Sequence, residues 1–196
     1  MLGSDGIQTA RRCRSSGLGR PILILWRGLL LWGLALGLWG AGPGAAAEDT
    51  SSLPPATGPV LLTVKGAIDH TNAPGVAQFD RAMLEALPQV TVTTHTPWTE
   101  GPIRFEGPLL RDILAQAGAR GQRLQALALN RYRAEIPVAD LQDYSVIAAL
   151  TRDGQPLTVR TQGPLWIVYP WDDHPGLDSG VTRGRAVWQL YEITVQ

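Results

Sequence analysis

The chain has 196 residues, in which 17 lysines and arginines balance 17 aspartates and glutamates. This length suits one domain with an appendage and is short for two domains. The only cysteine is Cys13, so the chain after it offers no disulfide, no thiolate ligand for a metal and no cysteine nucleophile.

Residues 1–47 predict a signal peptide. Basic residues precede an apolar run over 22–39, and Ala45-Ala46-Ala47 supplies the small residues of a cleavage site. The alternative is an uncleaved membrane anchor, since the run is nearly long enough to span a bilayer. Arg27 argues against the anchor, because a charge near the bilayer centre costs about 2.5–3.5 kcal/mol. We therefore expect an exported protein, cleaved near Ala47 or, alternatively, anchored in the membrane by its N-terminus.

Cleavage after residue 47 would leave 12 basic and 16 acidic residues, a net charge of −4. No basic patch remains that could hold a phosphate backbone, so nucleic-acid binding is not expected. Residues 48–59 are rich in Ser, Thr, Pro and Gly and predict a flexible linker. Residues 60–196 mix polar and apolar residues evenly, without an internal repeat, and predict a single domain.

In chain order, the first strand is predicted over 60–64, where β-branched and apolar residues run towards Gly66. A helix follows and ends at Pro88. Its apolar positions recur at helical spacing, at Phe79, Met83, Ala86 and Leu87. Residues 90–94 predict a second strand.

A second helix is predicted to begin at Gly107-Pro108, because proline favours the first helical position, and to end at Gly118. One face of it carries an apolar stripe, formed by Leu109, Leu110, Ile113, Leu114 and Ala117. Later strands are predicted over 124–129, 133–136, 146–150, 157–160, 165–169 and 187–195. Two short helices among about eight strands predict an α+β domain that is mainly β, with a mixed or mainly antiparallel sheet.

Five stretches carry polar and aromatic residues where simple turns would suffice. The first, residues 93–99, follows a strand, and strand ends commonly line small-molecule pockets. Thr94, Thr96 and Trp98 are its candidate binding residues. The alternative is a threonine-capped turn in which Trp98 fills the core.

The second stretch, residues 129–132, offers the two donors and one acceptor of the Asn130 amide. Its alternative is a tight turn with Tyr132 buried. In the third stretch, residues 136–140, we expect Asp140 to cap a turn and to have no role in chemistry.

The fourth stretch, residues 163–174, is a buried strand that runs into an aromatic and acidic loop, with Tyr169 and Asp172 as candidates. The fifth, residues 183–190, leads into the last strand. Its Arg183 and Arg185 could bind a carboxylate or phosphate through two hydrogen bonds each, or could be ordinary solvated arginines.

The inventory of reactive groups argues against several enzyme classes. The three histidines lack the spacing of zinc ligands, so no metal site is predicted. The nucleophile-elbow, dinucleotide-binding and P-loop motifs do not occur, and Asp172 and Asp173 are too close in sequence for an acid/base pair. No catalytic residue is predicted.

Short motifs along residues 61–195 together resemble the oxidoreductase molybdopterin-binding domain, the fold of sulfite oxidase and of the periplasmic methionine-sulfoxide reductase catalytic subunit. Each motif is short, and their shared order along the chain makes the set specific. The matching segments are Leu62–Gly66, Phe105–Leu114, Ala128–Tyr132, Ile136-Pro137, Gly163–Trp166, Tyr169-Pro170 and Val187–Leu190.

The resemblance includes one departure. In the family's enzymes, the loop that matches the residues after 90–94 carries a cysteine whose thiolate binds molybdenum. Here Thr96 stands near that place, and a hydroxyl is too hard and too weakly acidic a donor to replace a thiolate. The resemblance therefore implies a pocket for a reduced pterin as ligand, without molybdenum, and favours a binding protein over an enzyme.

Small exported members of this kind are similar to periplasmic pterin-responsive regulators. That likeness implies a membrane-bound partner, either an enzyme of cyclic-di-GMP turnover or a sensor kinase. A molybdenum-cofactor oxidoreductase, an accessory subunit of one, and an assembly partner with a vestigial pocket are the alternatives. Flat bicyclic pterins stack on aromatic rings, and Trp98 is the expected platform. The residues expected around one concavity are Thr94, Thr96, Trp98, Asn130, Tyr132, Tyr169, Asp172, Arg183 and Arg185.

Overall fold

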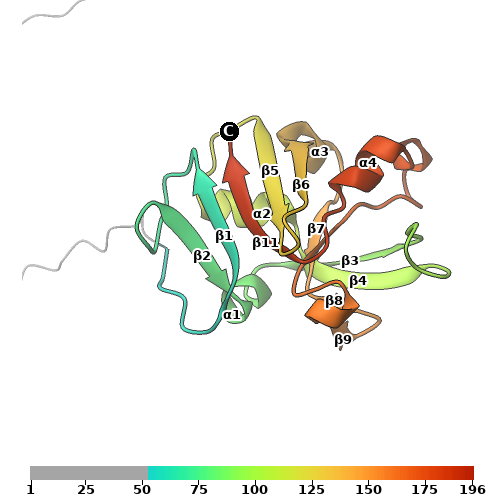
Figure 1. Ribbon diagram of the computed structural model, residues 1–196, viewed down its shortest axis with the longest axis horizontal. Coiled ribbons are helices and arrows are strands. Elements are labelled where there is room, and N and C mark those ends of the chain that lie inside the picture. The colour runs from blue at the N-terminus through green and yellow to red at the C-terminus, as the bar shows by residue number, and fades with distance from the viewer. Residues whose placement is uncertain (1–52) are drawn as a thin grey trace, which may run out of the picture. The chain divides into compact units, whose positions relative to one another are not determined.

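A computed structural model describes residues 53–196 of the chain (Figure 1). The predicted signal peptide, its predicted cleavage site and the first part of the predicted linker lie outside these residues. Within the described part, no helix is both long enough and apolar enough to cross a membrane.

A five-stranded sheet forms one side of the domain, at the left of Figure 1. Its central pair, β1 and β11, is parallel, and its other neighbouring strands are antiparallel. In spatial order the strands are β2 (Val76–Asp80), β1 (Val60–Gly66), β11 (Leu190–Val195), β5 (Arg123–Ala128) and β6 (Arg133–Pro137). Along β1 and β5, alternate residues are buried, as a sheet with one covered face requires.

A second sheet lies at the right of Figure 1 and is antiparallel. Its strands are β3 (Gln89–Thr94), β4 (Ile103–Pro108), β8 (Thr151–Arg152) and β9 (Gln155–Pro156). A separate antiparallel pair, β7 (Ile147–Ala149) and β10 (Trp166–Val168), packs beside β4. All residues of β7 and β10 are buried, so this pair belongs to the core.

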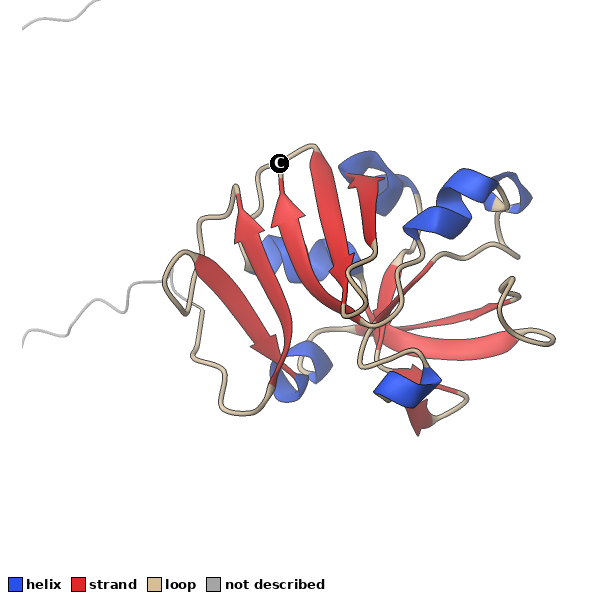
Figure 2. Ribbon diagram, in the orientation of Figure 1, coloured by secondary structure: helices blue, strands red, loops and turns tan. Residues whose placement is uncertain are grey.

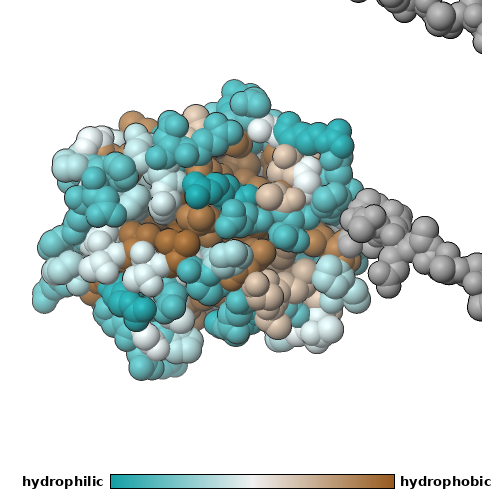
Figure 3. Space-filling view, turned by 180° about the vertical axis from the view of Figure 1, so that it is seen from behind, coloured by the Kyte–Doolittle hydropathy of each residue, from teal (hydrophilic) through white to brown (hydrophobic). Residues whose placement is uncertain are grey.

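Short helices lie around the sheets (Figure 2). They are α1 (Arg81–Glu85), α2 (Leu110–Gln116), α3 (Val138–Asp143) and α4 (Gly180–Arg185), with 3₁₀ turns at Val159–Thr161 and Pro175–Leu177. On the reverse side of the molecule, hydrophobic residues reach the surface in a band bordered by polar ones (Figure 3). The α+β class with mainly β structure is confirmed.

The first predicted helix is wrong at its start. Phe79 belongs to β2, where it is 1% exposed, and α1 begins only at Arg81. The side chain of Asp80 sets this boundary, because it accepts a hydrogen bond from the Met83 N–H at 2.9 Å and so caps the helix.

The second predicted helix also begins too early. Gly107 and Pro108 close β4, a strand that was not predicted, and α2 begins at Leu110. A Cβ atom at Gly107 would overlap the Ala148 carbonyl oxygen, so the glycine permits β4 to lie against β7. The buried stripe of α2 is confirmed, and Gly118 follows the helix with φ +62°, as predicted for a C-terminal glycine.

The strand predicted over 157–160 is wrong, since β9 ends at Pro156 and Val159–Thr161 forms a 3₁₀ turn. Helices α3 and α4 were not predicted either. Arg183 and Arg185 lie on α4 and do not lead directly into the last strand.

Part of the predicted linker is attached to the domain. Leu53 is only 9% exposed, and the Pro54 carbonyl accepts a hydrogen bond from the Asn72 amide at 2.8 Å. The backbone N–H groups of Thr57 and Gly58 donate to Asp80, both at 2.8 Å. The same carboxylate thus caps α1 and holds the segment that precedes β1.

Candidate functional site

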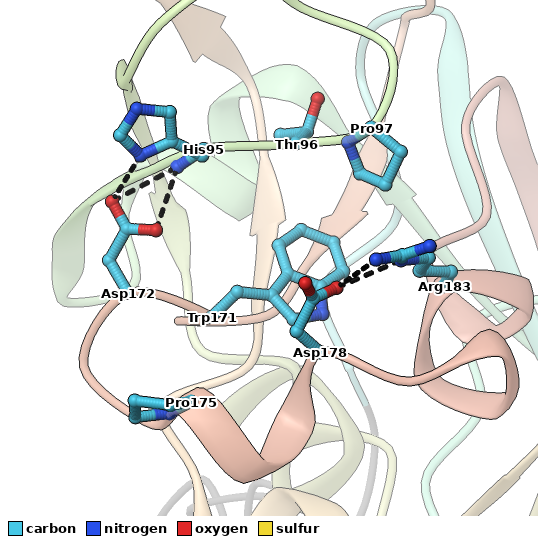
Figure 4. Close-up of a pocket in the computed structure, with 8 residues that line it drawn as sticks. All are labelled: His95, Thr96, Pro97, Trp171, Asp172, Pro175, Asp178 and Arg183. Atoms are coloured by element: carbon cyan, nitrogen blue, oxygen red, sulfur yellow. Dashed lines mark hydrogen bonds and ion pairs between the residues drawn. The ribbon is translucent and has the colours of Figure 1, made fainter.

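Three segments that are distant in sequence meet at one end of the second sheet. They are the loop after β3, the loop after β10, and the segment that carries the Pro175–Leu177 turn and α4. Their side chains are drawn together in Figure 4. Strand ends place polar groups here without interrupting the sheets, which is why such positions commonly form binding sites.

His95 and Asp172 join the first two segments. The Asp172 carboxylate accepts hydrogen bonds from the His95 backbone N–H at 3.1 and 3.2 Å and lies 2.8 Å from His95 Nδ1 (Figure 4). The buried Thr94 hydroxyl in turn accepts from the Asp172 backbone N–H at 3.1 Å. Partial burial raises the pKa of Asp172, but the hydrogen bonds from His95 outweigh it and hold that pKa below its usual value.

A cavity of about 440 Å³ opens between these segments, within the usual size range of a small-molecule site. Its lining residues are His95, Thr96, Pro97, Trp171, Asp172, Pro175, Asp178 and Arg183. In the view of Figure 4, the Trp171 ring lies between the His95–Asp172 pair and the Asp178–Arg183 pair.

The cavity wall contains one buried donor without a partner. Trp171 is 5% exposed, and its indole N–H makes no hydrogen bond within residues 53–196. Nearby, Arg183 donates to Asp178 Oδ1 at 2.8 Å. A buried unpaired N–H is costly, so a ligand acceptor that reached it would be stabilised.

A second cavity of about 290 Å³ lies next to the first and shares Arg183 with it. Its lining residues are Trp98, Asn130, Tyr132, Arg183, Gly184, Ala186, Val187 and Trp188. Its walls are therefore mainly aromatic and aliphatic, whereas the first cavity is lined by more charged and polar groups.

Trp98 is packed and also exposed. Its ring centroid lies 5.0 Å from that of Trp188, 6.1 Å from that of Trp166 and 6.4 Å from that of Trp171, all at the spacing of aromatic contacts. Its side chain nevertheless remains 37% exposed. The indole is thus part of an aromatic cluster, and it presents its free surface to the second cavity.

Asn130 and Tyr132 form a turn, as one of the two interpretations of that stretch predicted. Asn130 Oδ1 accepts from the Tyr132 N–H at 2.9 Å. The expectation that Tyr132 is buried is wrong: it is 48% exposed, with its hydroxyl donating to the Gly184 carbonyl at 2.8 Å. This bond ties the β5–β6 turn to α4.

Tyr169 and Arg185 line neither cavity and instead meet Asp140. The Tyr169 hydroxyl donates to Asp140 Oδ2 at 2.8 Å, and Arg185 lies 2.9 Å from the same oxygen. Burial, together with the Asp140 charge, raises the pKa of Tyr169 well above its usual value. The prediction that Asp140 caps a turn is wrong, because its carboxylate joins α3 to α4 and to the residue that follows β10.

The structure thus distributes the nine predicted residues over three places. Thr96, Asp172 and Arg183 line the larger cavity and Thr94 supports it, whereas Trp98, Asn130 and Tyr132 line the smaller one. Sequence reasoning did not select His95, Trp171 or Asp178 as site residues. His95 and Trp171 lay inside stretches already singled out, but no sequence signal marked Asp178.

Comparisons with known proteins agree on the fold. Residues 62–172 match the oxidoreductase molybdopterin binding domain. Among solved structures, the sulfane dehydrogenase SoxCD from Paracoccus pantotrophus is similar, with a TM-score of 0.54 and 17% sequence identity. The alignment covers 73% of this chain and 39% of that one, so this chain spans well under half of its length. No curated protein matches the chain in sequence.

The family match covers more than half of the chain and includes most of β1, the loop after β3 and the strand that leads to Asp172. The order of the sequence motifs and the mixed, mainly antiparallel sheets agree with it. The chain therefore belongs to the oxidoreductase molybdopterin-binding domain family, with the sulfite-oxidase type of fold.

Proposed function

We propose that this protein is an exported, non-catalytic pterin-binding protein that reports ligand occupancy to a membrane-bound signalling partner. The observation that carries this proposal is the chemistry of the loop after β3. Its buried Thr96 hydroxyl is bonded to the Thr99 hydroxyl at 2.8 Å and accepts from the Trp98 N–H at 3.2 Å. An oxygen engaged in this way supports the loop and does not substitute for a metal-binding thiolate.

The residues present fit a pterin ring but not thiolate-bound molybdenum. Residues 53–196 contain no cysteine and no cluster of three or more His, Asp or Glu side chains that could hold a metal. The larger cavity, by contrast, provides room for one bicyclic ring system. The proposed ligand is therefore a reduced pterin.

The polar groups of the larger cavity match the edge of a pterin. The ring's amino group and N–H are donors, and Asp172 or Asp178 can accept from them. Its carbonyl oxygen is an acceptor, which the unpartnered Trp171 N–H or Arg183 can satisfy. We place the ring in this cavity, where Trp171 takes the role that the sequence suggested for Trp98.

The test is a fluorescence titration of the protein with a tetrahydropterin under anaerobic conditions. We expect saturable quenching of tryptophan emission. Trp171→Phe keeps an aromatic ring but removes the indole N–H, so it should weaken binding about 5- to 10-fold, the worth of one hydrogen bond. Trp188→Phe, in the other cavity, is the matched control and should bind as the parent does. Equal affinities for both variants would contradict this placement.

The proposed export is tested separately. We expect the protein recovered from the periplasm to begin near Glu48, because the alanines at 45–47 form the cleavage site. N-terminal sequencing measures this directly. Recovery of the uncleaved chain in membranes alone would support the anchored alternative.

A further inference from the structure

Exposed apolar side chains gather around the smaller cavity. Six large hydrophobic residues are exposed within residues 53–196. Two of them, Trp98 and Tyr132, line this cavity, and three more lie on segments joined to its lining by the chain or by hydrogen bonds. The five, which we call the docking surface, are Trp98 at 37% exposure, Leu129 and Tyr132 at 48%, Val159 at 56% and Val181 at 63%.

Hydrogen bonds connect the segments that carry the docking surface. The Leu129 N–H donates to the Gln189 carbonyl at 3.0 Å, and the Gln189 side chain donates to the Val159 carbonyl at 2.9 Å. Tyr132 is bonded to Gly184 on α4, the helix that also carries Val181. Gln189 directly follows Trp188, which lines the cavity, so these bonds connect the segments of Leu129 and Val159 to the cavity wall.

The cavity at the centre has the size and lining of a pocket for one side chain. Its volume of about 290 Å³ is at the lower limit for a small-molecule site. The Trp98 and Trp188 rings meet edge to face at 84°, which fixes both walls. Tryptophan, tyrosine and arginine are the residues that dominate binding energy at protein interfaces, and all three line this cavity.

The charges beside Tyr132 and Val159 are positive, whereas the Trp98 loop carries the exposed Glu100. Arg131, Arg133 and Arg160 are exposed and have no ion pair within residues 53–196. Arg131 and Arg133 flank Tyr132, and Arg160 follows Val159. Unpaired arginines beside exposed apolar residues are complementary to an acidic apolar segment.

We propose that the docking surface binds an acidic segment of a partner protein whose aromatic side chain enters the smaller cavity. The arginines on the surrounding segments pair with the acidic residues on either side of that aromatic anchor. The inference rests on the proposed function only for the existence of a partner. Its site is separate from the cavity assigned to the pterin, although Arg183 lines both and so connects them.

The probe is a blocked pentapeptide with phenylalanine at its centre and aspartate or glutamate at the other four positions. Titrated into the full chain, it should change tryptophan emission with a Kd below about 100 µM at low salt and weaken as salt is raised. Replacing the central phenylalanine by alanine, or all four acidic residues by lysine, should each weaken binding at least about 10-fold. Equal binding of either altered peptide, or no binding of the first, would overturn the proposal.

Variants of the protein test the same surface. Val159→Glu and Arg160→Glu should each weaken peptide binding about 10-fold, because one adds a repulsive charge and the other reverses an attractive one. Val60→Glu and Arg81→Glu are the matched controls on exposed positions elsewhere, and they should bind as the parent does. Controls that lose as much affinity as the test variants would show that the peptide binds another surface.

The two proposals can fail separately. Trp171→Phe should still bind the acidic peptide while losing affinity for the tetrahydropterin, and Val159→Glu should show the reverse. Peptide binding without any pterin binding would overturn the proposed ligand and leave the docking surface supported. Pterin binding without peptide binding would overturn the docking surface alone.

Discussion

Asp140 shows how one residue can organise several elements. It lies in the first turn of α3, and its Oδ2 atom accepts both the Tyr169 hydroxyl and an Arg185 N–H. Both Asp140 and Arg185 are mostly buried, with side-chain exposures of 14% and 23%. These contacts position α4, which forms a wall of both cavities, without lining either cavity themselves.

Asp140→Asn should destabilise the protein by about 1–3 kcal/mol, because it leaves a buried arginine without its counter-charge and weakens the bond to Tyr169. Urea unfolding measures this change. The matched control is Glu135→Gln, whose partner Arg123 lies 4.0 Å away with both side chains more than 60% exposed. That surface pair should contribute close to nothing. An Asp140→Asn variant as stable as the control would contradict the structural role assigned to this cluster.

At the scale of single elements, β4 depends on Gly107. The strand passes so close to β7 that a Cβ at this position would meet the backbone of Ala148 and Ala149. Backbone atoms cannot move aside as a flexible side chain can, so the two strands would have to separate. This contact explains why Gly107-Pro108 belongs to a strand although the pair is typical of a helix start.

Gly107→Ala should therefore cost about 1–3 kcal/mol of stability, the usual penalty of overpacking. Gly176→Ala is the control, because within residues 53–196 no atom other than those of its chain neighbours lies within 4 Å of its Cβ position, and its backbone is not left-handed. The free energies of unfolding of the two variants decide the matter. If both variants are equally stable, β4 and β7 are not in the contact described.

One carboxylate holds the part of the chain that directly precedes β1. Asp80 accepts hydrogen bonds from the N–H groups of Met83, Gly58 and Thr57, and these bonds hold its pKa below the usual value although burial acts to raise it. A depressed folded-state pKa stabilises the protein above the unfolded pKa, about 3.9 for aspartate, and this contribution is lost as pH falls through the folded value.

We expect Asp80→Asn to reduce the loss of stability that the parent shows on acidification below about pH 4. Unfolding measured at several pH values gives the slope for each protein. Asp143→Asn, which alters an exposed carboxylate without a hydrogen-bond partner in the described residues, should leave the slope unchanged. A parent-like slope in Asp80→Asn would mean that the three N–H bonds do not favour the ionised form.

For the molecule as a whole, the sequence makes a clear prediction about metal content. The only cysteine is Cys13, and the sequence resemblance puts Thr96 near the place of the molybdenum-binding cysteine in the family's enzymes. Protein made in a molybdenum-replete host should therefore contain far less than one molybdenum per chain, because no thiolate is available in the domain. Elemental analysis of the purified protein measures the ratio. A ratio near one would support the oxidoreductase alternative.

Local sequence patterns correctly predicted the strands and helices whose type does not depend on what packs against them. The strands near 90–94 and 124–129 were predicted within a residue or two, since β-branched and alternating apolar residues specify them locally. The apolar stripe of α2 was also predicted correctly. Phe79, in contrast, fits both a helical spacing and a buried strand, and pairing with β1 decided between them.

The sequence by itself determined the family and the α+β class, because ordered short motifs and hydrophobic periodicity are properties of the chain. Only the tertiary structure decided how the predicted site residues are distributed between the two cavities and the core. Asp178, just before α4, forms an ion pair with Arg183 within α4. Tyr169 is hydrogen-bonded to Asp140 and lines neither cavity. The predicted residues therefore lie in two cavities and one buried cluster. The physical reason is that a polar side chain takes the hydrogen-bond partner that folding brings near it, and sequence spacing does not specify that partner.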